Sequence, residues 1–168
     1  NYLNIMTGNM IDYDIIGFVS IALVSLLSIL AAFRLRDITS IIIVALSIRV
    51  ILILIGHYVH PLPDSTADAV TFEGFSNRMA ADGFFNLLSY YEGPSSQFIS
   101  WLIAVFYSLF GRSMLMAQSI SLLLGIGCIF LAWNLAKKIW DKQTAKKVAW
   151  TTALFPSLVL YSVLVMRE

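Results

Sequence analysis

Charge is scarce in this chain. Only 12% of its 168 residues are Asp, Glu, Lys or Arg, whereas 59% are hydrophobic. A soluble domain carries roughly 25% charged residues, so this composition argues against a soluble core and favours a membrane protein. The net charge is +1, and without a strongly basic face we expect no nucleic-acid partner.

Cysteine is nearly absent as well. The single Cys128 lies in an apolar run and can form no intrachain disulfide. The first residue is Asn1, and because no basic stretch with an apolar run and a cleavage site follows it, we expect no signal peptide. Glu168 directly follows an apolar stretch. We therefore expect the sequence to be the N-terminal part of a longer membrane protein, inactive by itself.

Four apolar stretches are long enough to cross a bilayer, which takes about 20 helical residues. They predict spans at residues 15–33, 38–59, 114–136 and 148–166. Pro156 should kink the last span, because proline has no amide hydrogen to donate. A further apolar run at 98–110 is too short to span comfortably.

The basic residues predict the orientation, since positive loops prefer the cytoplasm. Two such loops follow the first and third predicted spans and contain Arg34, Arg36, Lys137, Lys138, Lys142, Lys146 and Lys147. The loop at 57–97 is acidic and should lie outside. Both basic loops are cytoplasmic only if residues 97–110 form a juxtamembrane helix, with Trp101 and Tyr107 suited to the headgroup region. The alternative is a short tilted span with the lysine-rich loop outside.

The outer loop predicts an amphipathic helix at 66–81 on the membrane surface. Ser65 and Asp68 approximate a capping box at its start, and Gly83 ends it. One face should carry Phe72, Phe75 and Met79, and the other Glu73, Ser76, Asn77 and Arg78. The fold expected is all-α: a polytopic transmembrane bundle with two juxtamembrane helices in its first outer loop.

The acidic side chains of this loop have two interpretations. Asp64 is either an N-cap that satisfies helix amides or a carboxylate held at the membrane surface as a general base. Asp68 and Glu73 are more simply interpreted as the solvated face of the interfacial helix.

Three other polar residues stand out. Arg49 lies in mid-span, where a charge is costly. It could reach a phosphate, but snorkelling, or pairing with a carboxylate in the missing part of the protein, is the better interpretation. His57 and His60 could face Asp64 together. A metal site needs further ligands, so we expect interfacial histidines and no metal.

A series of short motifs runs from residue 63 to residue 168. In order, they are Pro63-Asp64-Ser65, Ala81-Asp82-Gly83, Glu92-Gly93-Pro94 through Trp101, Leu109-Phe110-Gly111-Arg112-Ser113, Leu135-Ala136-Lys137-Lys138-Ile139-Trp140, and Phe155-Pro156 through Arg167-Glu168. Their order and spacing resemble the GT-C class of membrane glycosyltransferases, in particular the aminoarabinose transferase and protein O-mannosyltransferase group (glycosyltransferase family 39). The predicted span at 15–33 lies outside this resemblance.

The resemblance implies inverting transfer of a sugar from a polyprenyl-phosphate donor to a glycan, lipid or protein acceptor. Asp64 matches the catalytic base, and Glu168 matches a second acidic residue that contacts the acceptor or orients a cation. Arg78 and Arg167 are candidates to stabilise the leaving phosphate. Asp68 and Glu92 are further candidate substrate contacts. No cofactor is implied, a divalent metal is not favoured, and the implied location is a bacterial inner membrane with the site on its outer face.

The sequence departs from the family pattern at two places. Ser65 follows Asp64 where many relatives have a second acid, and Gly93 replaces a frequent lysine. Two other functions stay open. One is a polysaccharide polymerase or another membrane protein that handles lipid-linked sugars, and the other is a transporter subunit whose acids line a pathway.

Overall fold

The computed structural model describes residues 2–62, 68–91, 93 and 97–165, and in this part of the chain every regular element is a helix. The all-helical expectation is therefore confirmed. The elements are α1 (Tyr2–Arg34), α2 (Thr39–Tyr58), α3 (Asp68–Ala81), α4 (Phe84–Leu87), the 3-10 helix η1 (Leu88–Tyr90), α5 (Phe98–Phe110), α6 (Met114–Ile139), α7 (Lys142–Leu154) and α8 (Pro156–Tyr161).

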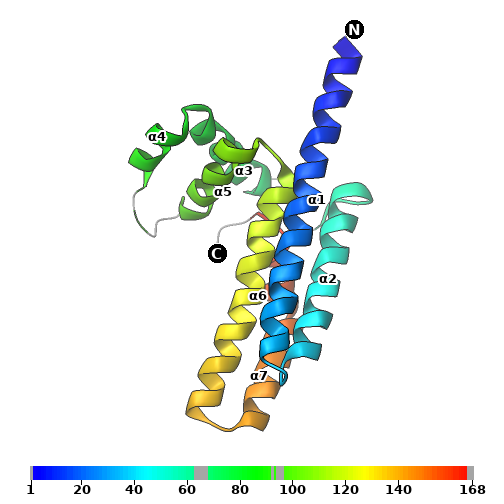
Figure 1. Ribbon diagram of the computed structural model, residues 1–168, viewed down its shortest axis with the longest axis vertical. Helices are drawn as coiled ribbons and strands as arrows, with labels where there is room; N and C mark the ends of the chain where they lie inside the picture. Colours follow the sequence, from blue (N-terminus) through cyan, green and yellow to red (C-terminus); the bar gives the residue numbers. More distant parts are fainter. Residues whose placement is uncertain (1, 63–67, 92, 94–96, 166–168) are drawn as a thin grey trace.

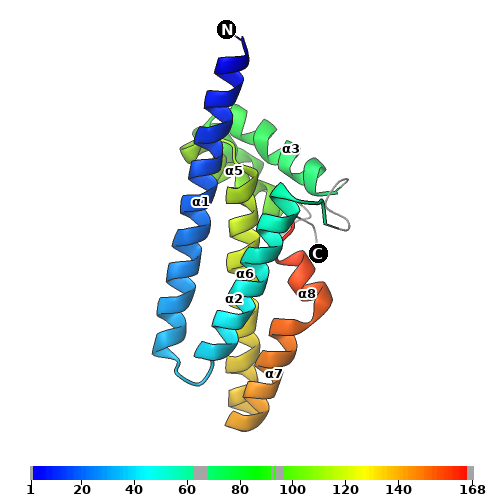
Figure 2. The same ribbon diagram turned by 90° about the vertical axis from the view of Figure 1, so that its right-hand side faces the viewer.

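Three of these helices are long and apolar enough to cross a membrane: Asp14–Arg34 within α1, all of α2, and α6. They run side by side in one bundle, with α7 packed against them (Figures 1 and 2). Their outward faces are apolar, as lipid-facing helices require. Exposed side chains on these faces include Leu23, Leu27, Ile51, Leu131 and Leu135. The bundle therefore has the character of a membrane protein.

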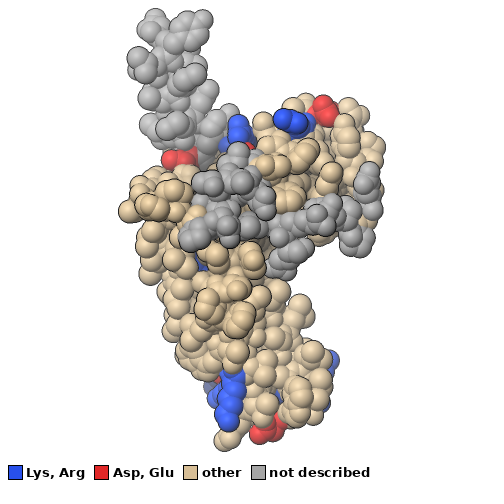
Figure 3. Space-filling model, turned by 180° about the vertical axis from the view of Figure 1, so that it is seen from behind, with Lys and Arg blue, Asp and Glu red and all other residues tan. Residues whose placement is uncertain are grey.

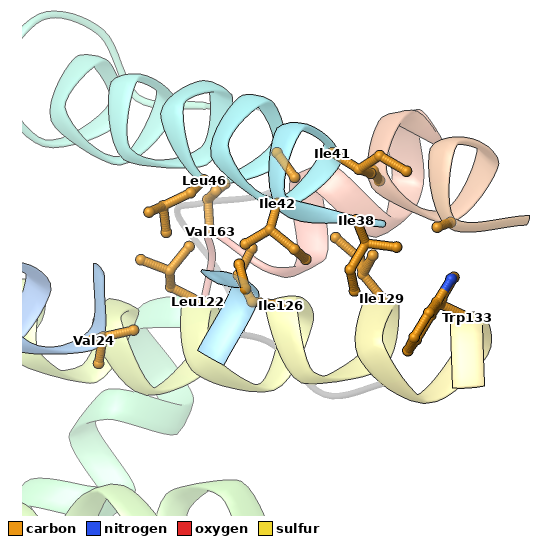
Figure 4. Close-up of a cluster of buried hydrophobic side chains, with 14 of the residues drawn as sticks. Val24, Ile38, Ile41, Ile42, Leu46, Leu122, Ile126, Ile129, Trp133 and Val163 are labelled. Atoms are coloured by element: carbon orange, nitrogen blue, oxygen red, sulfur yellow. The ribbon is translucent and has the colours of Figure 1, made fainter. Parts of the chain in front are cut away.

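The core of the bundle is built from aliphatic side chains of α1, α2 and α6 (Figure 4). Ile42 of α2 and Ile126 of α6 are almost completely buried there. Helix α7 contributes alanines at every fourth position, Ala145, Ala149 and Ala153, all without exposed surface. Residues four apart lie on one face of a helix, so α7 presents a smooth face on which α6 packs closely.

The segment predicted as a kinked fourth span is interrupted at Pro156. Helix α7 ends at Leu154, Phe155 has an extended backbone, and α8 begins with the proline at its first position. A proline at this position loses no hydrogen bond, because the first amides of a helix have no acceptor within the helix. The expected kink is thus a complete break, and α8 ends at Tyr161. Residues 162–165 then continue as buried, non-helical chain.

The two ends of the bundle differ in charge. The loop between α1 and α2 and the loop between α6 and α7 lie at the same end, where Lys142 Nζ is 2.7 Å from Asp37 Oδ1. The hydrogen bond from Lys142 holds the pKa of the Asp37 carboxyl below its usual value. Helices α3, α4 and α5 lie at the opposite end (Figure 1). Both basic loops thus share one end, as the charge argument required.

Candidate functional site

Helices α3 and α5 pack on each other beside the end of the bundle at which α2 ends and α6 begins (Figures 1 and 2). Small side chains allow this close approach. Ser76 and Ser100 have no exposed surface, and the Ser100 hydroxyl donates to the carbonyl of Phe72 at 3.1 Å. Ile103 of α5 contributes to a second apolar cluster with Met116 of α6. We call residues 68–91 and 98–110 the platform.

A buried carboxylate joins the platform to the bundle. Glu73 of α3 is 5% exposed. Arg112 donates from Nε to Glu73 Oε1 at 2.7 Å and from Nη2 to Oε2 at 2.8 Å. This two-point geometry is the strongest form of an arginine–carboxylate pair. The Tyr107 hydroxyl lies 3.2 Å from Glu73 Oε1 and 3.1 Å from the carbonyl oxygen of Ser113, so its one proton has two acceptors.

The turn between α5 and α6 positions Arg112 next to Glu73. Gly111 ends α5 with a φ of 91°, a conformation that favours glycine. Ser113 then caps α6 by accepting from the amide of Met116. The two caps fix a reversal only three residues long. Burial, and secondly the charge of Glu73, raise the pKa of the Tyr107 phenol well above its usual value, so Tyr107 stays a proton donor.

Three sequence-based interpretations of the platform are wrong. Glu73 is not on a solvated face. The assignment of α3 faces is also wrong, because α5 covers the side with Phe72, Glu73 and Ser76, while Phe75 is exposed. The Tyr107 side chain, expected to face the headgroup region, is instead buried against Glu73. Arg112 in the short loop 111–113 is the sequence feature that could have indicated a buried Glu73, because it offers a cation to pair with a carboxylate of α3.

Most of the predicted site residues fall outside the part of the chain that the structure describes: Asp64, Glu92, Arg167 and Glu168. Asp68 is the first residue of α3, and its side chain lies outside the described part. Arg78 is exposed in the last turn of α3, with its guanidinium carbon 5.9 Å from the centre of the Phe75 ring. The structure therefore does not test whether these side chains converge.

It does place the chain just before each of the two segments that contain Asp64 and Glu168. Leu62, just before the segment with Asp64, packs against the main core. Val165, just before the segment with Glu168, packs in the second apolar cluster with Tyr107 and Met116. Both described flanks therefore lie at the platform end of the bundle (Figure 2).

One of the two interpretations preferred for Arg49 from sequence, snorkelling, is wrong. It is 1% exposed and so does not snorkel. Its Nε donates to the Ser162 hydroxyl at 2.7 Å, and its Nη1 donates to the carbonyls of Ala45 and Ala153 at 3.2 and 3.0 Å. No carboxylate pairs with it among the described residues. The break at Pro156 leaves the last carbonyls of α7 without helical partners, and Arg49 satisfies one of them.

The histidines do not form a metal site in the described part of the chain, where no three His, Cys, Asp or Glu side chains could hold an ion. His57 Nε2 is 3.7 Å from Asp14 Oδ1 of α1. His60 Nδ1 is 2.8 Å from the carbonyl oxygen of Pro61. The first contact joins α2 to α1, and the second is local to the chain that follows α2.

Comparisons with protein-family models, curated proteins and solved structures find no significant match to this chain.

Proposed function

We propose that this chain is the N-terminal part of an inverting membrane glycosyltransferase. Its donor is a sugar linked to polyprenyl phosphate, and its acceptor is a glycan, a lipid or a protein. Asp64 is the general base, Glu168 contacts the acceptor, and the reaction takes place on the outer face of a bacterial inner membrane.

The observation that supports this proposal is the position of the platform. It lies at the end of the bundle opposite both basic loops, and the described chain that precedes each predicted acidic segment lies at that same end. A lipid-linked donor holds its phosphate and sugar at the membrane surface. A base that serves it must be held at that surface, within hydrogen-bond reach of the acceptor hydroxyl.

The Glu73–Arg112 pair gives the platform a defined orientation. Glu73 lies five residues after Asp68, the first residue of α3, and is tied to the loop that begins α6. This tie limits the movement of α3, the helix that directly follows the segment with Asp64, relative to the bundle. Catalysis loses rate steeply when a reacting group is misplaced by about 1 Å.

The test uses the full-length protein in membranes with a radiolabelled polyprenyl-phosphate sugar. Asp64→Asn should abolish sugar transfer at an unchanged level of membrane protein. Asp82→Asn is the matched control, because Asp82 is an exposed acid of the same loop whose carboxylate accepts from Tyr90 at 2.7 Å. It should keep full transfer. Unchanged transfer by Asp64→Asn would reject the assignment of the base.

A further inference from the structure

The part of the platform farthest from the bundle carries the most exposed aromatic side chain of the described structure. Phe85 of α4 is 86% exposed. Phe84, Leu88 and Tyr91 are 37%, 54% and 52% exposed. We call these four residues the aromatic tip. Figure 1 shows α4 extending sideways, away from the spans, so the bundle does not cover it.

The polar groups of this segment bind one another. The Tyr90 hydroxyl donates to Asp82 Oδ2 at 2.7 Å, and Asn86 Nδ2 donates to the Asp82 carbonyl at 2.9 Å. The Ser89 hydroxyl donates to the carbonyl of Asn86 at 2.6 Å. These polar groups are exposed, yet they satisfy one another and leave the side chains of Phe85 and Leu88 uncovered beside them. Exposed aromatic groups of this kind mark an interaction surface.

The tip is also held in place. The indole of Trp101 donates to the carbonyl of Leu87 at 2.9 Å, and its ring centre lies 4.8 Å from that of Tyr91. Leu87 has no exposed surface. The segment is thus fastened to α5 through its inward side, which leaves Phe85 and Leu88 directed outward from a fixed support.

The segment that carries the aromatic tip has no charged residues. From residue 83 to residue 91 there is no Lys, Arg, Asp or Glu. In Figure 3, the charged atoms that are coloured in this part of the molecule lie along its upper edge. An exposed aromatic surface on a segment without charged residues fits an interface between water and lipid, where aromatic side chains concentrate.

We propose that the aromatic tip inserts into the outer leaflet of the bilayer that holds the spans and anchors the platform to the membrane surface. The occupant is lipid and not a protein partner, because the tip extends beside the ends of helices whose own outward faces are lipid-facing. This inference depends on the membrane location of the bundle and not on the proposed sugar transfer.

The test places one nitroxide label at a time in the full-length protein, reconstituted in lipid nanodiscs. All other cysteines, Cys128 among them, are replaced by serine. Phe85→Cys and Leu88→Cys report on the tip, so that the result survives if one of them misfolds. Ser89→Cys is the matched control in the same segment, because Ser89 is exposed but polar.

Two reference positions calibrate the measurement: Leu131→Cys, on the exposed face of α6, and Gln143→Cys, exposed beside the basic loop. Collisions with oxygen, which dissolves in lipid, are compared with collisions with a water-soluble nickel chelate. The tip labels should collide with oxygen several-fold more than with nickel, at a ratio between those of Leu131 and Gln143, and the Ser89 label should have a lower ratio. A tip ratio equal to that of Gln143 would mean that the tip faces water. Low collision with both reagents would mean that protein covers it. Either result would overturn the proposal.

Discussion

Loss of Arg112 should destabilise the platform far more than loss of the Glu73 charge, although both substitutions break the same ion pair. The reason is unequal burial. The Glu73 side chain is 6% exposed and that of Arg112 is 56% exposed. In Arg112→Met, a carboxylate is left buried without its cation. In Glu73→Gln, the guanidinium can turn to water and the new amide keeps an oxygen for the Tyr107 hydroxyl.

The magnitudes follow from these end states. An uncompensated buried charge costs about 3–5 kcal/mol. Weakening hydrogen bonds to a charged group that can hydrate costs about 1–2 kcal/mol. The difference of roughly 2 kcal/mol corresponds to about a 30-fold difference in the equilibrium for opening α3 away from α5. The double variant should be more stable than Arg112→Met alone, because it contains no buried charge.

Hydrogen exchange of α3 amides measures this opening locally, without unfolding the bundle. It should be followed in nanodiscs for both single variants and the double variant. Amides of α7 serve as an internal reference, because α7 does not touch the platform pair. Equal protection losses in the two single variants, or a double variant that exchanges faster than Arg112→Met, would refute the reasoning from burial.

Two further predictions concern the break after α7. Arg49→Met should change the thermal midpoint of the full-length protein in detergent only slightly. The substitution leaves a buried carbonyl without its donor, which costs about 1–3 kcal/mol. It also removes a buried charge, and this gain in stability offsets that cost. Arg49→Lys should lower it clearly more, since an ammonium keeps the charge without the planar fork, and the reverse order would contradict this. Gly125→Ala should also lower the midpoint, because its new methyl group would clash with Cβ of Ser162, whereas Gly127→Ala, which meets nothing within 4 Å, should not. A midpoint that falls equally in both glycine variants would exclude the clash as the cause.

The sequence predicted the helices well where a single local property decides them. Helices α2 and α6 follow from the length of apolar runs, and Pro156 marked the place where the last predicted span is interrupted, although only a kink was predicted there. The end of α3 follows from Gly83, whose φ is 87°. Each of these features depends on residues close together in the chain, so no knowledge of packing was needed.

Partners across the structure could not be predicted in the same way. Whether Glu73 faces water or protein depends on α5, which begins 25 residues later. Arg49 binds Ser162 and Ala153 because a distant proline exposes a carbonyl near it. The exposed aromatic tip was missed for a related reason, since Phe85 is a surface residue only because α4 extends away from the bundle.

The candidate site itself stays a prediction for Asp64, Glu92, Arg167 and Glu168, which lie outside the described residues. What the structure adds is the support around them. The Glu73–Arg112 pair fixes α3 after one acidic segment, and the buried chain at 162–165 fixes the approach to the other. Resemblance to a family indicated the acids, but it did not indicate this support.

We propose that sugar transfer takes place at the platform end of the bundle, on the outer face. The most direct measurement supplies a water-soluble, short-chain polyprenyl-phosphate sugar to sealed membrane vesicles of known orientation that contain the full-length protein. Right-side-out vesicles should transfer the sugar without permeabilisation, inside-out vesicles should need it, and Asp64→Asn should be inactive in both. Transfer confined to intact inside-out vesicles, or transfer that does not depend on Asp64, would contradict the account.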